Sequence, residues 1–359
     1  MRKRESGIIT HAPGGESMRI TKSRALTNTF AAFATFSSLA VATTIPALGE
    51  VKVEKVQYLS LPNCYKLSNG TVEVIVTTDV GPRVIRYGFP GGDNAFAEIP
   101  DTSVKTELGE WKPLGGHRLW TAPEAWPRSY SPDNAAVEFK MEGANSVRLI
   151  QPLEEKTGIQ KEMIVSLDPE GTGVTVTHRL TNRNLWAVDV ACWALSIMNG
   201  GGTSIIPQEP FVSHDDTQNG LLPARKLVLW PFTDMTDPRW IFGKQYLRLK
   251  TDEAIKEAQK IGIANKRGWA AYHRKDTLFV KRFPYIDGAN YPDQGCNNET
   301  YTAAAFMELE TLAPMRHLNW GESTEHVEKW NLFKGVDIGA TEATLDAALQ
   351  PIITPLLAK

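Results

Sequence analysis

Residues 71–89, with the sequence TVEVIVTTDVGPRVIRYGF, indicate the fold class of this chain. Two short runs rich in β-branched residues flank a turn that contains Gly81 and Pro82. β-Branched side chains favour strands, and a Gly-Pro pair marks a turn. The stretch therefore predicts two consecutive β-strands.

The same pattern recurs along the chain. An Asp-Pro-Glu-Gly turn at residues 168–171 separates two alternating runs, which predicts a hairpin. Strands are also expected at residues 137–141, 147–151, 158–167, 173–180, 186–198, 245–250, 268–273, 277–283 and 301–311. Only residues 252–260 and 340–349 favour helices. We therefore predict an all-β fold, a large antiparallel double-sheet β-sandwich. Because no Pro- or Ser-rich linker interrupts it, residues 50–359 are expected to form a single domain.

Residues 1–49 have the features of a signal peptide. Arg19, Lys22 and Arg24 precede an apolar run at residues 30–42, and small residues end at Gly49. A start at Met18 would give a more conventional signal, and an uncleaved anchor is the alternative. The run is short and rich in Ser and Thr for a membrane span. We expect cleavage near Gly49, export to a periplasm or the outside, and no stable membrane insertion after cleavage.

Charge and motif content exclude several classes of function. Without residues 1–49 the chain keeps 33 basic and 39 acidic residues, a net charge of about −6, and it has no basic stripe, so a nucleic-acid partner is not expected. The three cysteines fit neither a disulfide framework nor a zinc pattern. The glycines at 200–202 lack the Lys-Ser/Thr ending of a phosphate loop. We expect no cofactor and no metal.

Residues 115–134, GGHRLWTAPEAWPRSYSPDN, combine aromatic rings with His, Arg and carboxylates. The glycines and prolines predict a loop. Aromatic rings beside polar groups suit a polar ligand with apolar faces, such as a sugar. The alternative is a structural loop in which His117 satisfies backbone carbonyls.

The C-terminal stretch MELETLAPMRHLNWGESTEHVEKW, residues 307–330, resembles the closing strands of aldose 1-epimerases, also called galactose mutarotases. The matching positions are Leu309-Glu310-Thr311, Pro314, Trp320-Gly321-Glu322 and Trp330. The segment GGHRLW resembles the His-Gly-bearing loop of that superfamily. Taken together with residues 69–89, these segments of the sequence resemble even more closely an uncharacterised group of bacterial proteins with a galactose mutarotase-like fold. The resemblance covers most of residues 65–335.

This resemblance implies a β-supersandwich with a sugar cleft on one concave sheet. In the family a strand glutamate removes the proton of the anomeric hydroxyl and a histidine protonates the ring oxygen; Glu310 and His117 match these catalytic positions. The sequence departs from the family at the second histidine, where Cys192 or Trp193 stands. An indole N–H only donates hydrogen bonds, so this position cannot supply a proton.

Further residues are candidates for substrate binding. Glu308 shares strand parity with Glu310 and is expected on the same side of the sheet, and Arg118 would share a side with Trp120 if this part is extended. For Trp120 and His178 the alternative is a place in the core, for Arg83 an exposed strand, and for Glu124, Arg128 and Asp133 a salt-bridged loop scaffold. The predicted substrate-binding residues are Arg118, Trp120, Arg83, His178, Trp193, Glu124 and Asp133.

Three functions follow as hypotheses. The first is an exported carbohydrate-active protein with an aldose 1-epimerase-type isomerase activity. The second is a non-catalytic glycan-binding protein, and the third is a polysaccharide-degrading enzyme or an accessory to one. All three share a sugar or oligosaccharide as the expected partner.

Overall fold

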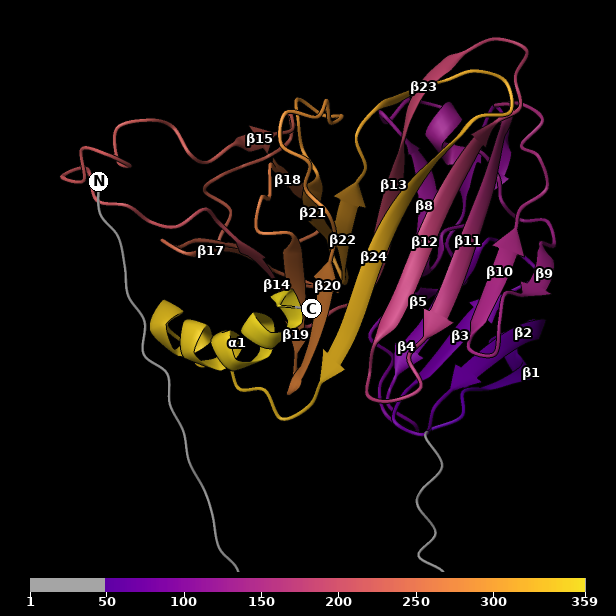
Figure 1. The fold of residues 1–359 in the computed structure, drawn as a ribbon, viewed down its shortest axis with the longest axis horizontal. Helices are drawn as coiled ribbons and strands as arrows, with labels where there is room; N and C mark the ends of the chain where they lie inside the picture. Colours follow the sequence, from indigo (N-terminus) through magenta and orange to yellow (C-terminus); the bar gives the residue numbers. More distant parts are fainter. Residues whose placement is uncertain (1–48, 359) are drawn as a thin grey trace, which may run out of the picture. The chain divides into compact units, whose positions relative to one another are not determined.

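Two large antiparallel sheets form the molecule in the computed structural model, which describes residues 49–358 (Figure 1). The predicted signal peptide lies outside the described residues apart from Gly49. No helix among the described residues is long and apolar enough to cross a membrane.

The first sheet has 12 strands. Two of them are short additions, since β5 (Glu98–Ile99) pairs with β8 and β23 (Arg316–Leu318) with β13. The other ten run in the spatial order β1 (Lys52–Tyr58), β2 (Leu61–Ser68), β3 (Glu73–Thr77), β4 (Arg83–Gly88), β8 (Leu114–Ala122), β13 (Val188–Asn199), β22 (Phe306–Leu312), β21 (Asn298–Ala303), β18 (Gln259–Ile263) and β15 (Leu227–Leu229).

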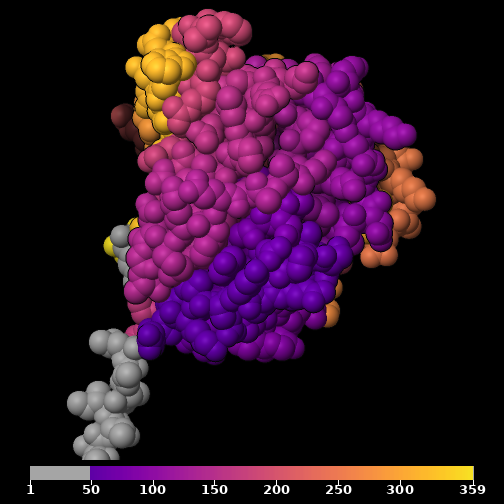
Figure 2. Space-filling view, turned by 90° about the vertical axis from the view of Figure 1, so that its right-hand side faces the viewer, coloured from indigo at the N-terminus to yellow at the C-terminus, as the bar shows by residue number. Residues whose placement is uncertain are grey.

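The second sheet has ten strands, and a further hairpin joins β6 (Val104–Thr106) to β7 (Gly109–Trp111). The spatial order is β16 (Trp240–Phe242), β17 (Tyr246–Lys250), β14 (Gly202–Pro207), β19 (Trp269–Arg274), β20 (Thr277–Arg282), β24 (Ser323–Phe333), β12 (Val174–Asn182), β11 (Ile159–Leu167), β10 (Ser146–Ile150) and β9 (Glu138–Met141). Segments from the first half of the described chain make up most of the face seen in Figure 2.

The predicted all-β double-sheet sandwich is confirmed. Residues 71–89 form the hairpin β3–β4, and the hairpins β9–β10, β11–β12 and β19–β20 lie where the turn residues predict them. Their alternating apolar residues meet between the two sheets, where Tyr87, Phe96, Phe279 and Trp330 pack ring against ring.

Helix α1 (Glu342–Leu357) covers the outer side of the second sheet (Figure 1). It is the predicted helix at 340–349, extended by two turns. Its buried Leu345, Leu349 and Ile353 pack against Trp269 and Val280. A capping box at Thr341 starts the helix.

Residues 252–260 are not helical. A turn at residues 253–254 and irregular backbone precede its last two residues, which begin β18. The Arg239 side chain donates to the carbonyl oxygens of Ile255, at 3.4 Å, and Glu257, at 2.6 Å. These carbonyls are therefore held by a distant arginine, while Lys260 pairs with Tyr301 in the sheet.

Residues 115–134 begin as a strand and not as a loop. Gly115 and Gly116 have φ values of +92° and +73°, and a Cβ there would lie 2.0 and 2.4 Å from the carbonyl oxygens of Ala97 and Val84. The glycines thus allow β8 to approach its neighbours closely instead of ending it. The loop starts only after Ala122 and contains a short 3₁₀ turn at Arg128–Tyr130.

Candidate functional site

The predicted site residues divide between the two faces of the first sheet. His117 and Arg118 are neighbours on β8, and successive strand residues point to opposite faces. Across β13, Leu195 lies opposite both Arg118 and Glu310, whereas Ser196 lies opposite His117. Arg118 and Glu310 therefore share the face turned away from the second sheet, and His117 lies on the inner face.

His117 belongs to a hydrogen-bonded chain that joins the two sheets. Its Nδ1 lies 2.8 Å from Ser196 Oγ, and its Nε2 lies 2.6 Å from Nε2 of His178 on β12. His178 Nδ1 lies 3.0 Å from the carbonyl oxygen of His326 on β24. These side chains are buried.

A buried ion pair completes this interior network. Lys281 Nζ lies 3.0 Å from Glu328 Oε1, and Trp330 Nε1 donates to Glu328 Oε2 at 2.7 Å. Thr311 donates to Glu328 and lies 2.7 Å from His326 Nε2. Among the described residues, no buried side-chain nitrogen or oxygen of this network lacks a hydrogen-bond partner.

The histidines of the interior network are neutral at pH 7. Burial lowers the pKa of His117 well below its usual value, lowers the pKa of His178, and lowers that of His326 to about 3. Burial opposes the charge of Glu328, but the Lys281 ammonium holds the pKa of this carboxyl below its usual range.

His117, His178 and Glu328 also have the residue types of a metal site, with ligand atoms within 4.8 Å of one another. However, the two Nε2 atoms are only 2.6 Å apart, which suits an N–H···N hydrogen bond. Two ligand nitrogen atoms around a tetrahedral zinc ion, each about 2.0 Å from the metal, would lie roughly 3.3 Å apart. Since Lys281 already neutralises Glu328, the residues fit a hydrogen-bonded network better than a metal site.

The other face of the first sheet carries a second polar group, the outer-face cluster of Arg118, Lys260, Glu299, Glu308 and Glu310. Lys260 Nζ lies 2.8 Å from Glu299 Oε2 and 3.1 Å from Glu310 Oε2. Arg118 Nη2 lies 3.4 Å from Glu308 Oε1. The side chain of Glu310 has no exposed surface, and that of Glu308 is 15% exposed.

Aromatic rings surround both cations. The Arg118 guanidinium lies 4.6 Å from the Trp111 ring centre and 4.5 Å from that of Trp120. Lys260 Nζ lies 4.8 Å from the ring of Trp193 and 4.7 Å from that of Trp230. Trp193 donates to Glu310 Oε2 at 2.8 Å.

Unlike the interior network, the outer-face cluster has unmet hydrogen-bonding capacity. Glu310 Oε1 and the Nε and Nη1 atoms of Arg118 are buried without a partner. Native structures pair nearly all such groups, so partnerless ones need an explanation. A ligand with both donors and acceptors would pair these atoms.

Burial also shifts the protonation of this cluster. Together with the nearby Glu310 carboxylate, it raises the pKa of Glu308 to about 7. It raises the pKa of Glu299 well above its usual value. Although burial opposes the charge of Lys260, Glu299 and Glu310 raise its pKa well above the usual range, so it remains charged. Burial lowers the pKa of Arg118 to about 10.

The remaining predicted residues support the segment after β8. Arg83 is fully buried and forms an ion pair with Asp133 at 2.7 Å, so it is not an exposed strand arginine. Glu124 accepts a hydrogen bond from Tyr130 at 2.5 Å, and Arg128 donates to the Pro123 carbonyl. Of the three residues expected to form a salt-bridged loop scaffold, only Asp133 forms an ion pair, and its partner is Arg83. Glu124 and Arg128 form hydrogen bonds within the loop instead.

The prediction that His117 and Glu310 face one sugar ring is wrong for this structure. The two side chains lie on opposite faces of the first sheet, and His117 is closed in by the second sheet. His178 lies in the same interior network and does not reach the outer face. Arg118, Trp120 and Trp193 do lie on the face of Glu310, where their roles stay predictions.

Sequence reasoning did not identify Lys260, Glu299, Trp111 or Trp230 as site residues. Lys260 fell in a stretch predicted as helix, where strand parity could not be applied. Glu299 is brought opposite Glu310 by the pairing of β21 with β22. Gly262 lets Trp230 approach, since a Cβ there would lie 3.1 Å from a Trp230 ring atom. No local pattern indicates these contacts.

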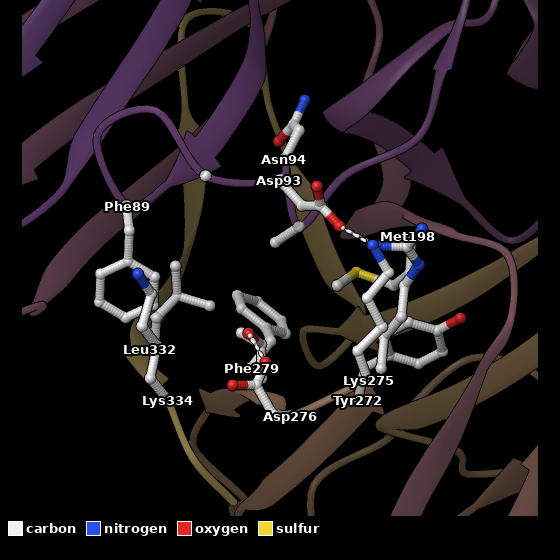
Figure 3. A pocket seen from close by; sticks show the side chains of 14 residues that line it. Phe89, Asp93, Asn94, Met198, Tyr272, Lys275, Asp276, Phe279, Leu332 and Lys334 are labelled. Atoms are coloured by element: carbon white, nitrogen blue, oxygen red, sulfur yellow. Dashed lines mark hydrogen bonds and ion pairs between the residues drawn. The ribbon is translucent and has the colours of Figure 1, made fainter.

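A separate cavity of about 320 Å³ lies between the ends of both sheets and contains none of the predicted site residues (Figure 3). Met198, Phe279 and Leu332 provide apolar walls. At its rim Asp93 pairs with Arg274 at 2.8 Å and with Lys275 at 2.5 Å. Among the described residues, none of its polar side-chain atoms is buried without a partner, so this cavity lacks the unmet capacity of the outer-face cluster.

Comparisons with known proteins support the fold. No protein-family model matches the chain, and a search of curated proteins finds no match. A solved TPR-domain containing protein from Parabacteroides distasonis matches 78% of this chain with 14% identity and a TM-score of 0.52; the chain spans 49% of that protein.

Other similar structures are a galactose mutarotase-like protein from Lactobacillus casei and a galactose mutarotase related enzyme from Lactobacillus acidophilus. Each matches 76% of this chain, with 12% and 9% identity, TM-scores of 0.45 and 0.44, and 100% and 98% of its own length covered. Galactose mutarotase-like proteins, the group that the sequence resembles, are thus among the solved structures similar to this chain.

Proposed function

We propose that the protein is an exported carbohydrate-active protein that binds a sugar at the outer-face cluster and interconverts its anomers, as an aldose 1-epimerase does. One observation supports this most: Glu310 keeps a buried, partnerless carboxylate oxygen beside a partially exposed Glu308 and an Arg118 whose Nε and Nη1 atoms lack partners. Sugar hydroxyls both donate and accept hydrogen bonds, and the carbon faces of a sugar suit tryptophan rings.

Anomer exchange requires a base for the anomeric hydroxyl and an acid for the ring oxygen. Glu310 suits the base because Trp193 and Lys260 fix one oxygen, Oε2, and leave Oε1 free to accept a proton. A sugar can reach Oε1 only after a neighbouring side chain moves, since Glu310 has no exposed surface.

The charges of the outer-face cluster favour an uncharged sugar over a sugar phosphate. Lys260 is already shared by two carboxylates, and Arg118 is paired with a third. Each cation of the cluster thus already has an acidic partner, and none without such a partner is left to bind a phosphate. We therefore propose neutral aldoses as the substrate class.

The test follows anomer exchange by NMR on a panel of neutral aldoses and one sugar phosphate. We expect the wild type to accelerate exchange of at least one neutral aldose over the buffer rate. Glu310→Gln should lower this acceleration by roughly 100-fold or more, the usual worth of a general base. Glu253→Gln, at an exposed turn, is the matched control. No acceleration by the wild type contradicts the isomerase.

The complete burial of Glu310 favours a second candidate, a non-catalytic glycan-binding protein. Tryptophan fluorescence quenched by a sugar, without accelerated exchange, would support this binder. New reducing ends released from oligosaccharides would instead support the link to polysaccharide degradation.

Export is the remaining part of the proposal. It rests on the sequence of residues 1–49. Expression of the full chain in a bacterium, followed by cell fractionation and N-terminal sequencing, tests it. A mature N-terminus near Gly49 in the periplasm or medium is expected, and an uncleaved cytoplasmic chain contradicts it.

A further inference from the structure

We propose that Glu308 delivers the proton to the sugar ring oxygen, the role that sequence reasoning assigned to His117. This inference rests on the proposed function and names the acid of the same site.

Glu308 lies where this role requires it. It shares its face of β22 with Glu310, two residues away, so the two Cα atoms are roughly 7 Å apart. The anomeric oxygen and the ring oxygen are bonded to the same carbon, so two groups at this spacing can reach both. Glu308 is 15% exposed and is held only by a 3.4 Å contact with Arg118, so it can meet a ligand.

The other groups on this face are less suited to donating a proton to a ligand near neutral pH. Glu299 also holds a proton, but its side chain has no exposed surface and lies 2.8 Å from Lys260. Lys260 is fixed between two carboxylates that keep it charged. Burial raises the pKa of Tyr301, which lies directly opposite Glu308, and that of Tyr130. Arg118 has a pKa of about 10, so it too keeps its proton near neutral pH.

The protonation of Glu308 agrees with this geometry. Burial and Glu310 raise its pKa to about 7, Arg118 and Lys260 lower it, and Glu124 raises it. A carboxyl group with this pKa is present both as acid and as base near neutral pH, the range in which a general acid works best.

The step balances in atoms and charge. Glu310 takes the proton of the anomeric hydroxyl, the electron pair of that O–H bond forms the carbonyl, and the bond between C1 and the ring oxygen breaks. Its electron pair goes to the ring oxygen, which takes the proton of Glu308. After rotation about C1–C2, the same steps in reverse close the ring and return both protons.

The experiment compares pH profiles of anomer exchange between pH 5.5 and 8.5 for the wild type, Glu308→Gln, Glu308→Asp and Glu310→Gln. We expect the wild-type rate to fall above about pH 7 as Glu308 loses its proton. Glu308→Gln should lose roughly 100-fold or more and show no such fall, and Glu308→Asp should recover part of the rate. Sugar-induced tryptophan quenching and thermal unfolding show that each variant folds and binds.

His117→Asn separates this proposal from the sequence-based assignment. Measured below its unfolding temperature, it should keep the wild-type profile because His117 lies on the inner face. A Glu308→Gln variant with the wild-type rate and profile, while Glu310→Gln is inactive, overturns the role of Glu308 and leaves the proposed function standing. A wild type without any acceleration overturns both.

Discussion

At the residue scale, Lys260 is the charge that allows two carboxylates to be buried together. Its ammonium lies 2.8 Å from Glu299 and 3.1 Å from Glu310. Lys260→Met would leave both acids facing each other without a cation. Removing one partner of a buried charge pair typically costs about 3–5 kcal/mol, and we expect a loss of this size in the free energy of unfolding. Urea unfolding at pH 7.5 measures it.

Two variants make this prediction specific. Replacing both acids in the triple variant Lys260→Met, Glu299→Gln, Glu310→Gln should restore part of the loss, because no buried charge is then unpaired. Glu253→Gln should change nothing, since its side chain is exposed. If the free energy of unfolding of Lys260→Met lies within about 1 kcal/mol of the wild-type value, the ion pairs do not stabilise the cluster.

Strand parity explains which site residues the sequence could predict. Glu308 and Glu310 were expected on one side, as were Arg118 and Trp120 if their segment is extended; it is extended, and both pairs share a side. His117 was misplaced because residues 115–134 were assigned to a loop, for which no facing rule exists. Once β8 is known to be a strand, the same parity separates His117 from Arg118.

At the element scale, α1 is fastened to the second sheet by Glu342 in its first turn. The Glu342 carboxylate accepts backbone hydrogen bonds from Lys244, Gln245 and Tyr246 at 3.0, 2.8 and 3.0 Å. Burial opposes its charge, but these hydrogen bonds lower its pKa. The carboxylate thus closes the β16–β17 turn against the helix.

Glu342→Gln should therefore loosen α1. An amide has one oxygen where the carboxylate has two, so at least one backbone N–H loses its acceptor, and the expected loss is about 2 kcal/mol. Because the pKa of Glu342 is lower in the folded chain, its carboxylate stabilises the fold at pH values above the unfolded pKa. The difference in free energy of unfolding between variant and wild type should therefore shrink as the pH falls below about 4.5. Hydrogen exchange of residues 342–357 measures this loosening of α1, and amide protection equal to that of the wild type would contradict the prediction.

The sequence predicted helices and strands correctly where the residues within each element determine its structure. The hairpins follow from turn residues and β-branched runs, and the C-terminal helix from its apolar spacing. The helix expected at 252–260 failed because its carbonyls are bound by Arg239, which comes from a different part of the chain. Contacts of that kind are not encoded in a local window.

At the scale of the whole molecule, two buried polar groups respond to pH in opposite directions. In the interior network, burial lowers the pKa of His117 and His178 and that of His326 to about 3. In the outer-face cluster, burial raises the pKa of Glu308 to about 7 and that of Glu299 well above its usual value. The interior histidines therefore stay unprotonated at pH values at which histidines of the unfolded chain are protonated. The carboxyl groups of the outer-face cluster stay protonated at pH values at which those of the unfolded chain are ionised.

Linkage gives the sign for each group. The neutral histidines contribute stability that is present above pH 6.5 and is lost as the pH falls, because only the unfolded chain is then protonated. Glu308 contributes stability that is fully present below about pH 4.5 and is lost as the pH rises through about 7. Between pH 5 and 6.5 the two contributions oppose each other, so we expect only a shallow pH dependence for the wild type.

Single substitutions should uncover the opposing slopes. Glu308→Gln removes a group that stabilises in acid, so its free energy of unfolding should fall more steeply than wild type on going from pH 7 to 5.5, by about 1.4 kcal/mol per pH unit. His178→Gln removes an interior histidine and should change the slope by a similar amount in the other direction. Urea unfolding at pH 7.0, 6.2 and 5.5 measures both, with exposed His214→Gln as the control. Parallel slopes for all three variants would mean that neither buried group is protonated differently in the folded and unfolded chain, and the separation of the site into two faces would then have no electrostatic consequence.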